Sequence, residues 1–216
     1  MFCHAQIFRN WNHAGQVALG ACLQTKSSST LSWFQPHADR SLGLIKRIAA
    51  GGQTRVIDVG GGTSTLVDDL LGLHGFDVTV LDISENALDV ARQRLAFDAR
   101  RVRLLAGDIT RLALPAHAYD IWHDRAVFHF MTTPEQRQAY IAQVRQAVRP
   151  GGHVIVAVFG PDGPMQCSGL PVMRYAPDAL HAQFGDAFEL VEHAPKAHRT
   201  LAGVEQQFVY CHCVMH

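Results

Sequence analysis

The sequence has no excess of charge of either sign. Lys and Arg together number 19, Asp and Glu together also number 19, and the formal net charge is therefore zero. A chain without a basic field does not attract nucleic acid or an anionic membrane, so we expect neither as a partner. No apolar run reaches the length that spans a bilayer.

The cysteines and histidines lack the spacings of a disulfide framework or a metal centre. The five cysteines are odd in number and contain no CxxC pair, and the 13 histidines contain no HExxH pattern. Cys211 and Cys213 would share one face of a strand beside His212 or His216, but a pair of this kind is more typical of a core. The pattern favours a reducing compartment, the cytoplasm, and predicts no metal.

The first 30 residues differ from the rest of the chain. They contain Arg9 and Lys26, no acidic residue and a serine cluster, which resembles a weak organelle transit peptide. The alternative is an N-terminal extension with little fixed structure. We expect residues 1–30 to be an appendage of one of these kinds and residues 31–216 to form a single domain, because this length suits one globular core.

From residue 55 onward, strand-like and helix-like segments alternate, as in a parallel sheet with helices on both faces. A helix that ends at Gly51 and Gly52 precedes them. Two strand-like runs at the end of the chain have no helix between them and predict an antiparallel hairpin at the sheet edge. The sequence therefore predicts an α/β fold with a doubly wound, seven-stranded, mostly parallel sheet. The expected strands are residues 56–59, 77–81, 102–106, 119–123, 153–159, 187–194 and 205–216, and the other helices are residues 65–73, 85–97 and 134–148.

The stretch "RVIDVGGGTSTLVDDLL" sets three glycines between a buried strand and a helix. Bare backbone N–H groups and the positive end of the helix dipole then face a ligand. One candidate ligand is a nicotinamide dinucleotide. Its sequence fingerprint needs a third glycine where Thr65 stands, so the sequence argues against this ligand. Asp82 ends the next strand, where an acidic side chain can accept hydrogen bonds from ribose hydroxyls.

Five motifs in order then carry a family resemblance. After "VIDVGGGTS" and Asp82 come "AGDIT", "YDIWHDRAVFHF" and "VRPGGHVIV". Over roughly residues 31–216 the chain resembles the class I methyltransferases that depend on S-adenosylmethionine, and a bacterial-type subgroup with mostly unassigned acceptors. The resemblance implies a Rossmann-like fold with S-adenosylmethionine as cofactor.

The resemblance also implies which residues bind the cofactor. Gly60, Gly61 and Gly62 would wrap its methionine part, and Asp58 would lie near the methionine amino group. Asp82 would bind the ribose. Asp108 would lie near the adenine amino group, with Ile83 and Ile109 flanking the adenine ring.

The acceptor side is predicted from the segments that follow the fourth and fifth strands, because open α/β sheets bind ligands at the carboxyl ends of their strands. His129 and Asp124 are the catalytic candidates, with His129 as the general base or alternatively a packed histidine. Arg125 and the lid residue Cys167 would line the acceptor pocket. Trp33 and Phe34 are assigned to the same pocket, where they would fold over the cofactor; the alternative is that they form a hydrophobic staple.

The expected reaction is in-line methyl transfer to S, N or O of a small-molecule acceptor. Positioning alone supplies much of the acceleration in such a reaction, so a base is not essential. The alternative is a protein-lysine N-methyltransferase, because "DRAVFH" stands where some of these enzymes carry D-K-G-T-x-D. Only Asp124 and the basic Arg125 match that pattern, whereas Ala126 and His129 depart from it. A nicotinamide-dependent oxidoreductase is a distant third hypothesis.

Overall fold

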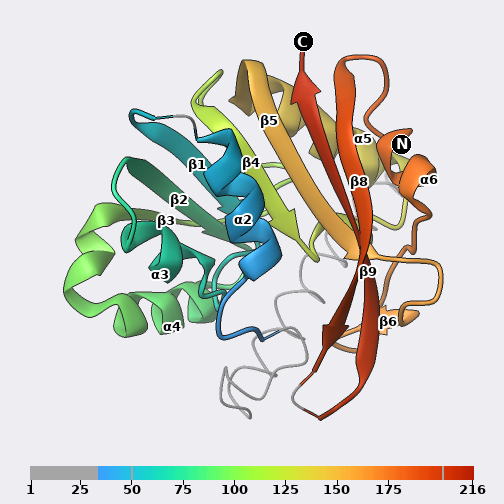
Figure 1. The fold of residues 1–216 in the computed structure, drawn as a ribbon, viewed down its shortest axis with the longest axis horizontal. Helices are drawn as coiled ribbons and strands as arrows, with labels where there is room; N and C mark the ends of the chain where they lie inside the picture. Colours follow the sequence, from blue (N-terminus) through green and yellow to red (C-terminus); the bar gives the residue numbers. More distant parts are fainter. Residues whose placement is uncertain (1–33, 50, 201) are drawn as a thin grey trace, which may run out of the picture.

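A computed structural model of the chain describes residues 34–49, 51–200 and 202–216. Within these ranges, seven strands form one sheet in the order β3-β2-β1-β4-β5-β9-β8 (Figure 1). The extension predicted at residues 1–30 and the pocket residue Trp33 lie outside the described residues. In sheet order, the strands are Val102–Ala106, Phe76–Asp82, Thr54–Val59, Tyr119–Arg125, Val148–Phe159, Glu205–Met215 and Phe188–Arg199.

The strand directions confirm the predicted fold class. β3, β2, β1, β4 and β5 are parallel to their neighbours, whereas β9 pairs antiparallel with both β5 and β8. Parallel strands need crossover connections, and helices supply them except between β3 and β4, where residues 107–118 form no helix. The described α-helices are α2 (Asp39–Ile48), α3 (Leu66–Leu71), α4 (Glu85–Leu95), α5 (Pro134–Ala147) and α6 (Pro177–His181). The described 3₁₀ helices are η2 (Ala96–Arg101) and η3 (Phe128–Phe130).

Apolar side chains cover both faces of the sheet because successive residues of a strand point to opposite sides. On β1, Val56 belongs to the cluster under α2, α3 and α4, and Ile57 belongs to the cluster under α5. Figure 1 shows α2 across the near face of the sheet and α5 behind it. The carboxyl ends of the central strands and the loops that follow them lie at the edge of the sheet between these layers, where open α/β sheets bind ligands.

The boundary between α5 and β5 differs from the sequence prediction. α5 begins with a capping box between Thr133 and Gln136 and ends at Ala147, close to the expected residue 148. β5 then starts at Val148, five residues before the expected residue 153. A shift in the pairing with β4 and a positive φ of 70° at Gly151 accommodate this extra segment.

The final hairpin is confirmed, but its first strand is longer than expected. β8 continues to Arg199, which pairs with Glu205 of β9. The added segment lacks an apolar pattern and contains Pro195, two features that argue against a central strand. Proline is tolerated here because β8 is the edge strand of the sheet, where one side needs no ladder hydrogen bonds.

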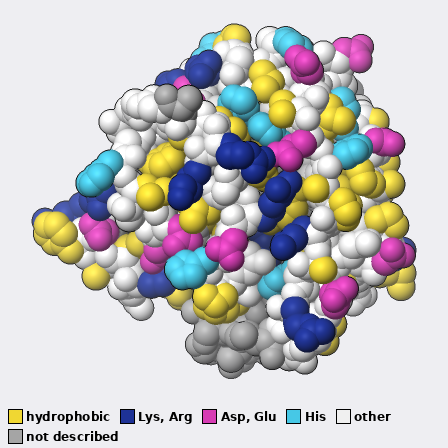
Figure 2. Space-filling model, in the orientation of Figure 1, with side chains coloured by type: hydrophobic (Ala, Val, Ile, Leu, Met, Phe, Trp, Pro, Cys, Tyr) yellow, Lys and Arg dark blue, Asp and Glu magenta, His cyan; other side chains and the backbone are white. Residues whose placement is uncertain are grey.

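Charged side chains connect α2 to the antiparallel end of the sheet. Arg40 Nη2 lies 3.2 Å from Glu192 Oε2 on β8, and Arg47 also contacts Glu192. Figure 2 shows Lys and Arg interspersed with Asp, Glu and His on this face. Among the described helices, none combines the length and apolarity that crossing a bilayer requires.

Candidate active site

Two neighbouring pockets open at the carboxyl ends of the central strands. The main pocket lies between the ends of β1 and β2, the segments after β3 and β4, and the hairpin of β6 (Gln166–Cys167) and β7 (Leu170–Pro171). The side pocket lies between the end of β1, the start of α3 and residues 34–38. Gly60, Thr63 and Arg125 line both pockets, so the two pockets adjoin at these residues.

The three glycines after β1 are required by close contacts within the protein. Gly60 has a φ of 73°, and a Cβ there would lie 2.1 Å from Val127 Cγ2. A Cβ on Gly61 would lie 2.3 Å from Asp58 Oδ2, and one on Gly62 would lie 2.5 Å from the Ala87 Cβ. The glycines therefore let the backbone pass tightly between β4, β1 and α4 while it lines both pockets.

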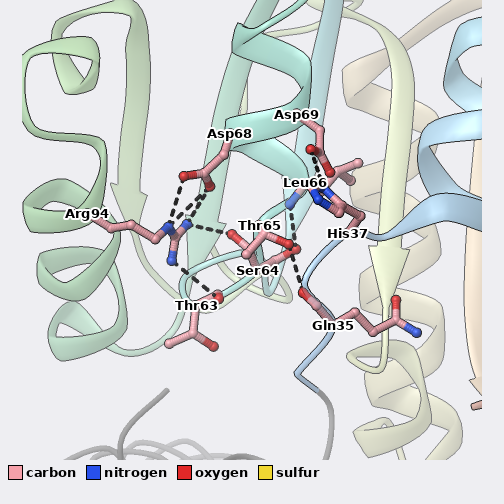
Figure 3. Close-up of polar contacts among 9 residues, drawn as sticks. All are labelled: Gln35, His37, Thr63, Ser64, Thr65, Leu66, Asp68, Asp69 and Arg94. Atoms are coloured by element: carbon pink, nitrogen blue, oxygen red, sulfur yellow. Dashed lines mark hydrogen bonds and ion pairs between the residues drawn. The ribbon is translucent and has the colours of Figure 1, made fainter. Parts of the chain in front are cut away.

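Arg94 of α4 fixes the loop that follows the glycines (Figure 3). Its guanidinium donates to both carboxylate oxygens of Asp68, at distances of 2.9 to 3.1 Å, and to the carbonyl oxygens of Thr63 and Ser64. This multidentate pairing holds the loop backbone against the first turn of α3.

Residues 35–37 hold the other side of the same loop (Figure 3). The Thr65 hydroxyl donates to the Gln35 carbonyl over 2.9 Å, and His37 Nδ1 lies 2.8 Å from Asp69 Oδ1. Phe34 and Gln35 consequently line the side pocket. The structure places Phe34 beside Asp58, whereas the sequence analysis predicted it in the acceptor pocket.

Asp82 is a buried carboxylate at the end of β2 that lines the main pocket. It accepts hydrogen bonds from the Gly62 and Ser84 backbone N–H groups at 3.0 and 2.8 Å. Burial raises the pKa of this carboxyl to about 6, although both hydrogen bonds act in the opposite direction. The carboxylate that is predicted to bind the ribose therefore also holds the glycine loop through the Gly62 N–H.

Asp108, Ile83 and Ile109 surround the same end of the main pocket. Asp108 Oδ1 accepts from the backbone N–H and the hydroxyl of Thr110, at 2.9 and 2.8 Å, which fixes the turn after β3. Ile109 is buried and Ile83 is half-buried. The structure therefore gathers the four residues of the predicted adenosine site, Asp82 included, around one cavity.

Asp58 joins a buried polar chain that sequence reasoning missed. Its Oδ1 lies 2.7 Å from His123 Nδ1, and His123 Nε2 lies 2.8 Å from the hydroxyl of Ser41 on α2. All three residues are at most 2% exposed. The second carboxylate oxygen, Asp58 Oδ2, is buried without a hydrogen-bond partner among the described residues. An acceptor in that position fits a cationic ligand group.

The predicted acceptor residues have mixed placements. Arg125 and Cys167 both line the main pocket, beside the apolar side chains of Phe130, Met131 and Leu170. Those three apolar residues were not predicted from the sequence, because only the packing of η3 and the β6–β7 hairpin brings them together. This end of the pocket can hold an apolar molecule next to a cation.

Asp124 does not face the pocket. It is fully buried and accepts hydrogen bonds from the Val127 and Phe128 N–H groups and from the Tyr140 hydroxyl, at 2.8, 2.9 and 2.5 Å. Burial raises the pKa of this carboxyl to about 6. The geometry gives it a structural role, because it fixes the turn that carries Val127 to the pocket wall.

His129 is also shielded from solvent and does not line the main pocket. It is fully buried, its ring packs against Phe130 and Phe159, and both ring nitrogens lack hydrogen-bond partners among the described residues. Burial lowers the pKa of this imidazole to about 3. The geometry does not support the prediction of a general base, because a buried imidazole cannot reach an acceptor. The geometry favours the alternative of a packed histidine.

His129→Leu is expected to raise the free energy of unfolding at pH 7 by about 1 kcal/mol, because it removes an unpaired buried N–H. The unfolded imidazole binds a proton near pH 6.5 and the folded one only near pH 3. Wild type therefore loses up to about 1.4 kcal/mol per pH unit from this group as pH falls through that range, and the variant does not. Urea unfolding at pH 7 and at lower pH measures both effects. A less stable variant with unchanged acid sensitivity would contradict this account.

Comparisons with known proteins agree with this geometry. A family model described as a methyltransferase domain matches residues 56–152. The malonyl-[acyl-carrier protein] O-methyltransferase of Halalkalibacterium halodurans is 28% identical over 111 residues, covering 50% of this chain and 40% of that protein. The O-methyltransferase cnsE of Penicillium expansum is 27% identical over 166 residues, covering 75% and 57%. The chain thus spans about half the length of these curated relatives.

Solved structures share the fold. A SAM-dependent methyltransferase from Methanosarcina mazei superposes with a TM-score of 0.67 at 15% identity, covering 79% of this chain and 96% of that one. The glycopeptide N-methyltransferase MtfA gives a TM-score of 0.64 at 20% identity, covering 82% and 95%. The domain match favours methyl transfer over the nicotinamide-dependent alternative. Together with the sheet order and the pocket at the carboxyl edge of the sheet, it agrees with the resemblance of this chain to the class I S-adenosylmethionine-dependent methyltransferases and identifies a methyltransferase domain over residues 56–152.

Proposed function

We propose that the chain catalyses methyl transfer from S-adenosylmethionine to S, N or O of a small-molecule acceptor. The observation that carries the proposal is the pair of adjoining pockets at the carboxyl edge of the sheet. One pocket holds the residues predicted for adenosine, and the other holds the buried carboxylate predicted for the methionine amino group.

The residues present fit each part of the cofactor. Asp82 would accept hydrogen bonds from the ribose hydroxyls, and Asp108 would lie near the adenine amino group. Ile83 and Ile109 supply apolar surface for the adenine ring. Because Asp82 Oδ2 already accepts from Gly62 N–H, the same carboxylate would position the ribose relative to the glycine loop.

The side pocket fits the methionine part. Asp58 Oδ2 is a buried acceptor without a partner among the described residues, and an ammonium group would pair with it. His123 would hold Asp58 in this orientation by donating from Nδ1, since Ser41 occupies the other ring nitrogen. Gly60 and Gly61 would line the path between the two pockets.

When bound, the cofactor would supply a methyl group activated on a sulfonium, and a lone pair of the acceptor would bond to this methyl carbon as the C–S bond breaks and S-adenosylhomocysteine leaves. The residues of this chain position the two reactants and exclude water, and such positioning reaches effective molarities on the order of 10⁵–10⁸ M. Neither His129 nor Asp124 is assigned a proton transfer here, because both are sealed in the core. The acceptor's proton would pass to solvent.

A small-molecule acceptor is favoured over a protein because the β6–β7 hairpin forms part of the wall of the main pocket. Cys167, Ser168 and Leu170 of this hairpin face the segment that carries Phe130 and Met131. The hairpin is held down by the Met173 N–H, which donates to the His129 carbonyl over 2.8 Å. The names of the curated relatives, two O-methyltransferases, are compatible with an oxygen acceptor but do not decide the atom.

Transfer of a radiolabelled methyl group tests the proposal. The purified chain is incubated with labelled cofactor and panels of thiols, amines, phenols, carboxylic acids and lysine-rich proteins. We expect label to enter at least one small-molecule class, and the Asp58→Asn variant to show a higher KM for the cofactor. Label that enters only protein would contradict the small-molecule acceptor and favour the protein-lysine alternative.

A further inference from the structure

Arg125 is a cation built into the junction of the two pockets. It is the last residue of β4, and among the described residues that line either pocket it is the single Lys or Arg. The acidic residues that line these pockets, Asp58, Asp82 and Asp108, all have a predicted role toward the cofactor. Arg125 has no predicted role in binding the ammonium, the ribose or the adenine of the cofactor.

The guanidinium is fixed and largely removed from water. Its Cζ lies 5.2 Å from the centroid of the Phe208 ring, in a cation–π arrangement. Burial lowers the pKa of Arg125, whereas a side-chain hydrogen bond with Tyr210 and electrostatic interactions with Tyr210, Asp58 and Cys167 act to raise it. An arginine keeps its proton in proteins, so the side chain presents an oriented charge with a planar array of donors to the pocket.

A carboxylate is the ligand group that matches the guanidinium, because two parallel N–H groups of the guanidinium can donate to the two carboxylate oxygens. Two carboxylates could come into this space, that of the cofactor's methionine and one on the acceptor. Arg125 lines the main pocket together with Cys167 of the β6–β7 hairpin and with Phe130 and Met131, and it also lines the side pocket.

Charge also distinguishes the two carboxylates. The cofactor carries a positive sulfonium, and an arginine next to the reacting end would repel it in a site shielded from water. An anionic acceptor between the two cations would offset that repulsion.

We infer that the methyl acceptor is a small molecule with an apolar body and a carboxylate, and that Arg125 recognises this carboxylate. The inference depends on the proposed methyltransferase function.

Binding to wild type loaded with S-adenosylhomocysteine tests the inference without turnover. Phenylacetate and octanoate are titrated against their neutral amides, phenylacetamide and octanamide. We expect the acids to bind about tenfold more tightly than the amides, as a buried cation discriminates against an uncharged isostere. The inference is overturned if the acids show no advantage, whether both sets bind or neither does. This comparison needs no variant, so it remains decisive if substitutions at Arg125 are unstable.

Arg125→Gln then assigns the preference to the side chain, with Arg103→Gln as the matched control on exposed β3. The first variant is expected to remove the advantage of the acids, and the control to retain it. Both should bind S-adenosylhomocysteine as wild type does. A loss of S-adenosylhomocysteine binding in Arg125→Gln, with methylthioadenosine binding unchanged, would assign Arg125 to the cofactor's carboxylate and overturn the inference. Wild type that fails to bind S-adenosylhomocysteine would instead overturn the proposed function.

Discussion

Asp58→Asn is expected to weaken the binding of S-adenosylhomocysteine by about 1.5–3 kcal/mol, roughly 10–150-fold. The substitution removes the charge from a buried oxygen that has no hydrogen-bond partner among the described residues. The remaining amide oxygen can still accept from His123 Nδ1, so the chain to α2 is retained. Calorimetric titration measures the affinity.

Methylthioadenosine provides the internal control for this variant, because it keeps the adenosine part and lacks the amino acid. Its affinity should be unchanged in Asp58→Asn. Asp162→Asn, on the exposed segment after β5, is the matched control and should bind both ligands as wild type does. An equal loss for both ligands in Asp58→Asn would mean that the substitution disturbs the fold and that Asp58 does not face the methionine part.

Gly62→Ala is expected to weaken cofactor binding by about 1.4–2.7 kcal/mol, roughly 10–100-fold. The new Cβ would lie 2.5 Å from the Ala87 Cβ and 2.7 Å from Asp82 Oδ2. Overpacking of this kind typically costs about 1–3 kcal/mol. Because a single side chain can adjust more readily than α4 can shift, we expect the strain to displace the Asp82 carboxylate, which is proposed to bind the ribose.

Gly43→Ala on α2 is the matched control, because no atom lies within 4 Å of a Cβ built there. Alanine at a helical position is favoured over glycine by about 0.8–1.0 kcal/mol, so this variant should be more stable and bind the cofactor normally. Retention of wild-type affinity in Gly62→Ala would show that the glycine loop and Asp82 do not act together on the cofactor.

Local sequence patterns were sufficient to predict the central strands and the residues at their ends. Asp82 and Asp108 follow short apolar runs, and the structure brings both to one cavity. A parallel sheet explains this success, because every strand that ends in a loop delivers that loop to the same edge. The order of the elements therefore fixes the position of these side chains without knowledge of their packing.

Residues whose role depends on long-range packing were not predictable. His123 pairs with Asp58, 65 positions earlier, and with Ser41 on a helix that precedes the sheet. Asp124 and His129 lie in the segment expected to face the acceptor, but Asp124 at the end of β4 and His129 in η3 are both buried in the core. A titratable residue after a strand has the same local pattern whether it faces a ligand or fixes a turn.

The end of β8 was also not predictable from the local sequence pattern. The segment around Pro195 has no apolar alternation, so its pairing with β9 depends on register set elsewhere in the hairpin. Sequence patterning specifies strands that are buried on both faces, and it specifies an edge strand only weakly.

The central claim is that the two adjoining pockets bind S-adenosylmethionine. Calorimetric titration of the purified chain with S-adenosylmethionine, S-adenosylhomocysteine and NAD⁺ tests it most directly. We expect the first two ligands to bind with one site per chain and NAD⁺ to show no binding. Binding of NAD⁺ without binding of either adenosyl ligand would contradict the account.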